Sequence, residues 1–285
     1  MNELRLAGTQ VRAVSVGGLE TSIDLPELKV AFDIGRCPPF VVARETILFT
    51  HAHMDHLGGI AYHAATRALR NLGPPTYVVP PEILDDLVEL FAVWRRLDRS
   101  TMAAQFVPLG PGGRFRLRRG LEARPFRALH VAPCQGYALV SQRQKLRPEF
   151  VGLPSQELAH LRRSGQVLTT PQEVVEVAFC GDTRIEVVER EPAVRTARLL
   201  ILEATFLDDR VTVAEARGMG HVHLDEIVER AELFENEAIL LTHASPRYTR
   251  HEVAALLEKK LPPRLAERVT PLYSPSSSSP PDAPK

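Results

Sequence analysis

Four side chains that could bind metal ions lie within six residues of one another: His51, His53, Asp55 and His56. They follow residues 46–49, an apolar run with β-branched and aromatic side chains that predicts a buried strand. The end of a strand holds such side chains in place, and the loop that follows lets them converge. Because imidazole and carboxylate groups together suit zinc, manganese or iron, we predict a metal site here rather than an incidental polar loop.

Four further predicted strands also end beside a polar side chain that could bind a metal ion or carry chemistry. Taken singly, each such residue has a structural alternative, because a lone histidine is more often a hydrogen-bonded core residue and Gly-Asp-Thr suits a turn. The residues alone leave both interpretations open. The strands and side chains are 123–129 with His130, 174–181 with Asp182, 198–204 with Glu203, and 238–242 with His243.

The pattern His-x-His-x-Asp-His after a strand resembles the signature of the metallo-β-lactamase superfamily. The resemblance implies an α/β (α+β) fold, an αββα sandwich of two mixed β-sheets flanked by helices, with a two-metal site along one edge. It also implies a ligand set: His51, His53 and His130 would hold one metal ion, Asp55, His56 and His243 the other, and Asp182 would bridge them.

Two divalent ions about 3.5–4 Å apart could activate a water molecule and neutralise a phosphoryl or acyl oxyanion, and Asp55 could both bind a metal ion and orient that water. The superfamily includes lactamases, thiolesterases, lactonases, phosphodiesterases and nucleases. The motif therefore predicts the fold but does not choose the reaction.

Two more segments narrow the choice. Residues 203–206 read Glu-Ala-Thr-Phe and residues 220–223 read Gly-His-Val-His. Together with Gly-Asp-Thr at 181–183 they resemble ribonuclease Z, and the likeness to its short, plant-type form extends over roughly residues 14–272. In that family a glutamate and a histidine form a proton-donor pair, which the resemblance assigns to Glu203 and His221. The alternatives are a solvated strand end for Glu203 and a neighbour of a helix N-cap for His221.

The resemblance implies a binuclear zinc phosphodiesterase of the tRNase Z type. It would be an endoribonuclease that removes the 3′ trailer of precursor tRNA by attack of a metal-activated water and leaves a 3′-hydroxyl on the tRNA. It implies two Zn²⁺ per subunit, with Mn²⁺ or Fe²⁺ as alternatives, and a homodimer. Other functions remain open: a phosphodiesterase for cyclic nucleotides or small diesters, or a weakly active RNA-binding homologue. A lactonase or thiolesterase is disfavoured, since acyl chemistry offers no evident role for Glu203 and His221.

The chain departs from the family in two places that concern RNA. The Pro-x-Lys-x-Arg-Asn loop of bacterial ribonuclease Z is absent, and the segment in the position of the tRNA-gripping arm, 141–172, is short. Basic side chains there could still contact RNA phosphates, with a solvated surface as the alternative. They are Arg143, Lys145, Arg147, Arg162 and Arg163.

The composition is that of a soluble globular protein. The 285 residues are 44% hydrophobic and 25% charged with a net charge of zero, so overall basicity does not predict nucleic-acid binding. We predict one domain over residues 1–272 and a disordered Ser/Pro-rich tail over 273–285. The three cysteines form no CxxC pair, and we find neither a transmembrane-length apolar run nor a signal-peptide pattern, so we expect a cytoplasmic protein without membrane contact.

The periodicity of apolar residues predicts the remaining helices. They span 59–71, a helix opened by Pro80-Pro81, 224–234, and 249–261 as the last. The second helix has a wide apolar stripe that includes Leu90, Trp94 and Leu97. We interpret this stripe as core packing, with a dimer interface as the alternative.

Overall fold

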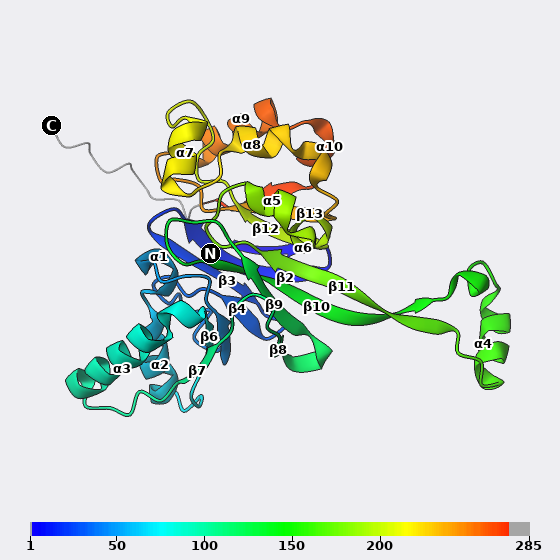
Figure 1. The fold of residues 1–285 in the computed structure, drawn as a ribbon, viewed down its shortest axis with the longest axis horizontal. Coiled ribbons are helices and arrows are strands. Elements are labelled where there is room, and N and C mark those ends of the chain that lie inside the picture. Colours follow the sequence, from blue (N-terminus) through cyan, green and yellow to red (C-terminus); the bar gives the residue numbers. More distant parts are fainter. Residues whose placement is uncertain (1, 274–285) are drawn as a thin grey trace.

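The computed structural model describes residues 2–273, within which the chain forms two mixed seven-stranded β-sheets that pack face to face (Figure 1). In the first sheet the spatial order follows the sequence. β1 to β4 pair antiparallel, and β4 to β7 pair in parallel. The strands are β1 (Asn2–Leu6), β2 (Thr9–Val16), β3 (Glu20–Leu25), β4 (Val30–Phe32), β5 (Thr46–Leu48), β6 (Thr76–Val79) and β7 (Gln105–Pro108).

The second sheet has the spatial order β14-β13-β12-β11-β10-β9-β8. β11 to β14 pair in parallel, and β8 to β11 pair antiparallel. Its strands are β8 (Phe115–Arg116), β9 (Glu122–Arg127), β10 (Gln135–Leu146), β11 (Thr169–Phe179), β12 (Leu199–Glu203), β13 (Ala238–Thr242) and β14 (Val269–Pro271).

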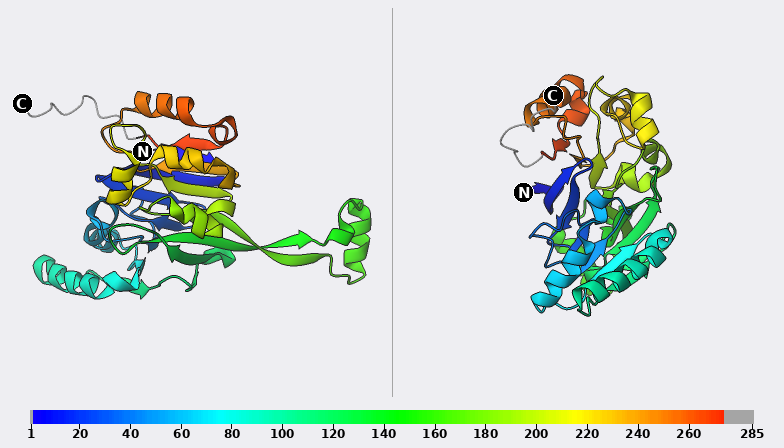
Figure 2. Two further views of the ribbon diagram at one scale, coloured as in Figure 1. Left: turned by 45° about the horizontal axis from the view of Figure 1, so that its top comes forward. Right: turned by 90° about the vertical axis from the view of Figure 1, so that its left-hand side faces the viewer.

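Helices cover the outer faces of both sheets, which confirms the predicted αββα sandwich (Figures 1 and 2). The first sheet carries α1 (Met54–Leu57), α2 (Ile60–Leu69) and α3 (Leu84–Asp98). The second carries α5 (Glu186–Arg190), α6 (Pro192–Thr196), α7 (Val213–Met219), α8 (Leu224–Glu229), α9 (Arg250–Lys260) and α10 (Pro263–Ala266). Short 3₁₀ turns lie at η1 (Pro81–Ile83), η2 (Arg118–Gly120), η3 (Pro148–Phe150) and η4 (Ala231–Leu233).

Strand alternation divides the apolar residues between three layers of core. In β5, Leu48 points between the sheets, whereas Ile47 and the following Phe49 pack under α2 and α3. Parallel strands covered on both faces have nearly continuous apolar sequences, as in β12 and β13, where every residue is buried. The sandwich therefore holds the carboxyl ends of these strands rigidly at one edge of the molecule.

The short segment 141–172 comprises the outer parts of β10 and β11 and the connection between them. β10 and β11 continue well beyond the body of the sandwich as a two-stranded ribbon, with α4 (Ser155–Arg163) at its tip (Figure 1). Outside the body both faces of the ribbon are solvated, so these strand residues are polar and lack the alternation that predicts a strand. We call this protrusion, residues 141–172, the arm.

The predicted core packing of the second helix is wrong for much of its stripe. The helix forms as η1 followed by α3, and Leu87 and Phe91 are buried. Leu90, Trp94 and Leu97, however, are 39%, 40% and 70% exposed. A stripe this wide spans more of the helix than one sheet face can cover, so its outer part faces solvent.

The C-terminal part of the chain continues beyond the helix predicted to be the last. α10 and β14 follow α9, and Leu272 is buried between the sheets. The Arg250 guanidinium lies 4.5 Å from the centroid of the Tyr273 ring. The rest of the predicted tail, 274–285, lies outside the described residues. Among residues 2–273, no helix combines the length and apolarity needed to cross a bilayer.

Candidate metal centre and catalytic site

The side chains singled out by the sequence gather at one edge of the sandwich, where parallel strands of both sheets end. Binding sites of α/β proteins commonly lie at such carboxyl ends. In the first sheet, Asp33 follows β4 and His51 lies just beyond β5. His53 precedes α1, and Asp55 and His56 belong to this helix. In the second sheet, His130 lies between β9 and β10, and the ends of β11, β12 and β13 carry Asp182, Glu203 and His243.

Three histidines and Asp182 form one cluster at this edge. His51 Nε2 lies 3.8 Å from Asp182 Oδ2, and His53 Nδ1 lies 3.3 Å from His130 Nε2. One potential ligand atom from each of the four residues lies within 4.8 Å of the others. His51 and Asp182 are buried while His53 and His130 are half-buried, so the cluster opens to solvent on their side.

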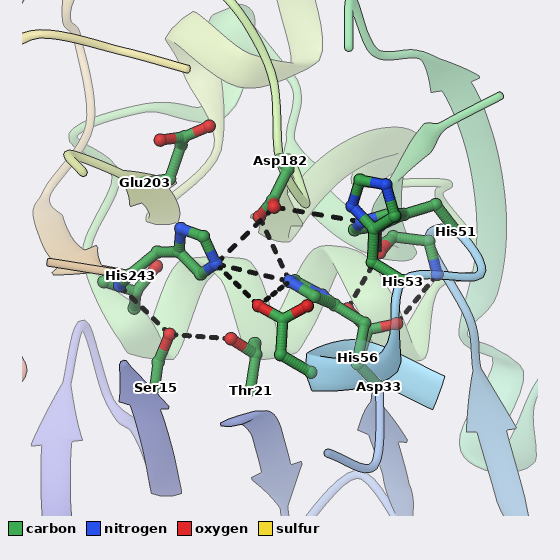
Figure 3. A network of polar contacts seen from close by, with 12 residues as sticks. Ser15, Thr21, Asp33, His51, His53, His56, Asp182, Glu203 and His243 are labelled. Carbon is green, nitrogen blue, oxygen red and sulfur yellow. Dashed lines mark hydrogen bonds and ion pairs between the residues drawn. The ribbon is translucent and has the colours of Figure 1, made fainter. Parts of the chain in front are cut away.

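A second cluster shares Asp182 with the first and adds Asp55, His56 and His243. Figure 3 shows His56 and His243 directed toward Asp182. His243 Nε2 lies 3.2 Å from Asp55 Oδ2 and 3.5 Å from Asp182 Oδ2. His56 Nε2 lies 3.2 Å from Asp182 Oδ1. The carboxylate of Asp182 thus lies near imidazole nitrogens of both clusters, as a bridging carboxylate would.

A buried hydrogen-bond network behind the clusters orients two of these imidazoles. Asp33 accepts hydrogen bonds from the Thr50 backbone N–H and hydroxyl, both at 2.8 Å, and lies 2.8 Å from His56 Nδ1. Thr50 Oγ1 lies 3.0 Å from His51 Nδ1. A carboxylate only accepts hydrogen bonds, so His56 carries its hydrogen on Nδ1. The Thr50 hydroxyl already donates its hydrogen to Asp33 and must accept from His51, whose hydrogen is therefore also on Nδ1. The Nε2 lone pairs of both imidazoles are then directed into the clusters.

This arrangement fits metal ions. Nε2 of His51 is buried and has no hydrogen-bond partner in the described part of the chain, and a buried polar atom without a partner is unusual. Imidazole Nε2 lone pairs and carboxylate oxygens are also a donor set suited to divalent ions. The outer nitrogens of the imidazoles are anchored, as those of metal-binding histidines commonly are.

Further contacts orient the remaining proposed ligands. His130 Nδ1 lies 2.9 Å from the Gly220 carbonyl oxygen, and His243 Nδ1 lies 2.9 Å from Thr205 Oγ1. The Gly18 backbone N–H donates a hydrogen bond of 2.9 Å to Asp55 Oδ2. These supporting groups have no recognisable pattern in the sequence.

Glu203 and His221 form a hydrogen-bonded pair beside the second cluster. His221 Nδ1 lies 2.9 Å from Glu203 Oε1, and the His221 and His243 rings are stacked with centroids 5.3 Å apart. Glu203 is 1% exposed, which excludes the solvated strand end, and it also accepts hydrogen bonds from the backbone N–H groups of Thr183 and Val222. The structure therefore brings together the two residues that the sequence proposed as a donor pair.

The electrostatic surroundings favour charged forms of two proposed catalytic residues. Burial alone would raise the pKa of Asp55, but opposing interactions, of which the hydrogen bond with His243 is the largest, lower it to about 2. Burial would likewise lower the pKa of His221, but the charge and hydrogen bond of Glu203 raise it to about 9. At neutral pH, Asp55 is ionised and His221 carries a proton it can donate.

His243 reaches its position through a strained backbone. It adopts φ = 63°, a left-handed conformation that is uncommon for a residue other than glycine. Its carbonyl oxygen would lie only 2.9 Å from a Cβ atom added at Gly17, so Gly17 allows the close approach of this segment. Strain of this kind is concentrated at functional sites.

Asp33 had a signal in the sequence that could have identified it, whereas Thr205 did not. Asp33 is a fully buried carboxylate directly after an apolar strand, the same pattern that identified Asp182 and Glu203. Thr205 had no such pattern, because its role depends on His243, far away in the sequence. His223 caps α8, accepting a hydrogen bond from the Asp225 backbone N–H, and is not part of the donor pair.

The five basic residues proposed to bind RNA are spread along the arm. In the part of the chain that the structure describes, Lys145 and Arg162 have no ion-pair or hydrogen-bond partner. The others have partners: Arg143 makes a bidentate ion pair with Glu176 (2.6 and 2.7 Å), Arg147 lies 3.8 Å from Glu149, and Arg163 Nε donates to the Ala159 carbonyl oxygen.

Comparisons with known proteins identify the family and the fold of this chain. Residues 36–244 match the family model described as Beta-lactamase superfamily domain. Human tRNase Z, short form, has a similar fold, with a TM-score of 0.56 and 17% sequence identity over 94% of this chain and 90% of that chain. YhfI of Bacillus subtilis, a metallo-β-lactamase fold protein, has a TM-score of 0.62 at 13% identity, covering 93% of this chain and 97% of its own.

The sequence relatives are more specific. The tRNase Z named TRZ1 of Arabidopsis thaliana is 42% identical over 268 residues, which cover 93% of this chain and 95% of that protein. Ribonuclease Z of Halalkalibacterium halodurans is 25% identical over 240 residues, or 76% of this chain and 74% of that protein. The chain belongs to the β-lactamase superfamily and, within it, to the tRNase Z family.

Proposed function

We propose that this protein is a zinc-dependent endoribonuclease that removes the 3′ trailer from precursor tRNA. The observation that carries the proposal is the pairing of two clusters of metal-binding side chains with the Glu203–His221 pair, in a chain 42% identical to a tRNase Z over nearly its whole length. The clusters alone would serve many hydrolases, whereas a proton donor beside them suits a leaving group as basic as a ribose 3′ oxygen.

The proposed ligand set is that of the two clusters. His51, His53 and His130 would hold one zinc ion, Asp55, His56 and His243 the second, and Asp182 would bridge them. Two such ions would supply a nucleophile at neutral pH and positive charge that stabilises the phosphoryl group. Manganese or iron are the alternatives that this donor set allows.

The chain's own groups would carry the protons of the reaction. Asp55, ionised and fixed by the Gly18 N–H, orients the attacking water and accepts its proton. A bond forms between the water oxygen and phosphorus, and the bond from phosphorus to the tRNA 3′ oxygen breaks. His221, held by Glu203, gives its proton to that oxygen. The products are a tRNA 3′-hydroxyl and a trailer with a 5′-phosphate.

The arm is suited to bind the substrate far from the cut. β10 begins beside the site at Gln135, whose N–H donates to the Thr50 carbonyl, and its 12 residues lead away from it for about 40 Å. Basic residues on the arm would therefore contact a remote part of the tRNA. Of the five proposed, Lys145 and Arg162 have no competing partner among the described residues.

We further propose a homodimer, a cytoplasmic location and one domain over residues 1–272. The exposed face of α3, with Val88, Leu90, Trp94 and Leu97, offers an apolar surface for a second copy. The three cysteines are unpaired, as in a reducing compartment. The burial of Leu272 between the sheets supports a single domain that extends to this residue.

Cleavage of a precursor tRNA that carries a 3′ trailer tests the proposed function, with the ends of both products mapped. We expect one cut at the 3′ boundary of the tRNA, lost with a chelator and restored by zinc. Asp55→Ala should abolish this cut. Turnover of bis(p-nitrophenyl) phosphate without any cut in the precursor would refute the tRNA-processing role and support a small-molecule phosphodiesterase. Near-wild-type activity of Asp55→Ala would refute the proposed mechanism.

A further inference from the structure

A cavity lies directly beside the metal-binding clusters. It has a volume of about 510 Å³ and lies between the segment 127–135 and the facing residues Pro80, Glu82 and Pro111. This volume is within the range of sites that bind small ligands. Of the proposed metal ligands and the donor pair, only His130 lines the cavity. It therefore adjoins the reaction site without being part of it, and we call it the side pocket.

The side pocket has both apolar and polar walls. Three prolines, two alanines and Leu129 make up half of its lining residues, and Val131, next to His130, is 60% exposed. Apolar side chains can contact the face of an unpaired nucleobase, and polar groups beside them can bind its edge. Val131 thus places an exposed apolar side chain next to a proposed metal ligand.

An arginine side chain without an ion-pair partner among the described residues lies at the rim of the side pocket. The Arg127 side chain is exposed and makes no ion pair or hydrogen bond within residues 2–273, whereas the nearby Arg124 pairs with both Glu122 and Glu173. A free guanidinium is suited to a phosphate group. Glu82 also lines the pocket and does not pair with Arg127. A bare phosphate would be repelled by that carboxylate, whereas a nucleotide offers base N–H groups to Glu82 and a phosphate to Arg127.

We propose that the side pocket binds the first nucleotide of the 3′ trailer, with Arg127 contacting the phosphate that follows it. This inference rests on the proposed function. The scissile phosphodiester joins two nucleotides, and the 3′ oxygen on the tRNA side must face His221. His221 does not line the side pocket, although its ring centroid lies 5.0 Å from that of His130. The first trailer nucleotide is attached to the same phosphate through its own 5′ oxygen. The side pocket, which opens from the site at His130, is therefore placed to receive this nucleotide.

The test compares precursor tRNAs with trailers of one and of several nucleotides. A one-nucleotide trailer lacks the phosphate assigned to Arg127, so Arg127→Ala should leave its kcat/KM unchanged. With longer trailers Arg127→Ala should lower kcat/KM about tenfold, as expected for one lost hydrogen bond to a charged group. Arg96→Ala is the matched control, because Arg96 is an exposed arginine on α3 with no partner among the described residues. The melting temperature of both variants should equal that of the wild type.

A second variant tests the pocket itself. Val131→Asp places a charge on the apolar wall and should slow cleavage for every trailer length, since the first trailer base is always present. It should leave inhibition by mature tRNA, which has no trailer, unchanged.

Three results would overturn the assignment. Equal effects of Arg127→Ala on short and long trailers would exclude the proposed contact between Arg127 and the trailer phosphate. Weaker inhibition by mature tRNA in either variant would move the pocket to the tRNA side of the cut. Wild-type cleavage of every trailer by Val131→Asp would exclude the proposed contact between the side pocket and the first trailer base. Failure of the wild-type protein to cut any precursor is a separate outcome, because it would refute the proposed function.

Discussion

Replacing Asp33 with asparagine tests whether the buried network behind the clusters sets the protonation of the histidines. Asp33 lies outside the clusters, yet it contacts His56 directly and His51 through Thr50. Its carboxylate is completely buried and accepts all three hydrogen bonds that reach it. The substitution keeps the size of the side chain and exchanges one acceptor for a donor.

The exchange should reverse the hydrogen bonds on one side of the network. The amide oxygen of asparagine would still accept from the Thr50 backbone N–H, so its NH₂ group would face His56 Nδ1 and the Thr50 hydroxyl. His56 would then carry its hydrogen on Nε2, which lies 3.2 Å from Asp182 Oδ1. The Thr50 hydroxyl would be free to donate to His51 Nδ1, which would move the hydrogen of His51 to Nε2 as well. A nitrogen that carries a hydrogen cannot bind a metal ion.

We therefore expect a loss of metal affinity at both clusters. Changes to groups that orient metal-binding histidines typically lower affinity 10- to 100-fold, or about 1–3 kcal/mol. The fold should change less, since the substitution removes a buried charge and retains the backbone hydrogen bond of Thr50. The free energy of unfolding without metal should change by no more than about 2 kcal/mol, the scale of one altered hydrogen bond.

Competition with a chromogenic zinc chelator measures the affinity, and chemical denaturation in the presence of chelator measures the stability. Asp24→Asn is the matched control, because Asp24 is also completely buried but pairs with Arg44, away from the clusters. This control should lower stability and leave zinc affinity unchanged. Wild-type zinc affinity in Asp33→Asn would refute the assigned hydrogen positions, and equal loss in Asp24→Asn would attribute the effect to general destabilisation.

Three other variants address the proton donor, the arm and a buried histidine. His221→Ala should slow RNA cleavage about 10²–10⁴-fold with unchanged zinc content and spare a p-nitrophenyl ester, whose leaving group needs no proton; loss of zinc would identify His221 as a ligand. Replacing Arg162 and Arg163 by alanine should raise KM for precursor tRNA and reduce the slope of log KM against log salt concentration by roughly 1.4. Cleavage of a small diester should be unchanged, and equal losses on both substrates would refute the arm contacts. Burial and a neighbouring guanidinium lower the pKa of His63 to about 4, so only the unfolded chain binds this proton between about pH 6.5 and pH 4. Its contribution to stability is complete above about pH 6.5, and about 2 kcal/mol should be lost between about pH 7 and pH 5. Denaturation curves for His63→Gln should lack that loss, and a loss of the wild-type size would refute the reasoning.

The sequence predicted the fold and the residues that meet at the site because the relevant signals are local. Six consecutive residues carry the first ligands, and Asp182 and His243 each follow an apolar strand. Parallel strands end at one edge, so residues in these positions converge whatever the length of the segments between them. The pattern needs no knowledge of the loops.

The supporting groups could not be predicted in the same way. Thr205 binds His243, and the Gly220 carbonyl binds His130, and both contacts join segments that are distant in the sequence. Neither residue type identifies such a role by itself. The arm shows a related limit, because polar strands that leave the body lose the alternation that one-sided burial imposes. The short helices α5, α6, α7 and α10 have too few turns to show a clear period.

The arrangement around Glu203 decides which variants report on the proton donor. Glu203 accepts from His221, from the N–H of Thr183 next to Asp182, and at 2.5 Å from the hydroxyl of Thr205, which in turn contacts His243. One carboxylate thus connects the proposed donor with two proposed metal ligands. Removing it would release all three segments and leave several buried donors unpaired, which is costly. A loss of activity in a Glu203 variant would therefore mix proton transfer with metal binding. His221 is the more exposed member of the pair, and its removal leaves the hydrogen bonds of Glu203 with Thr183 and Thr205 in place. Its variant therefore reports on the proton-transfer step more directly than a Glu203 variant does.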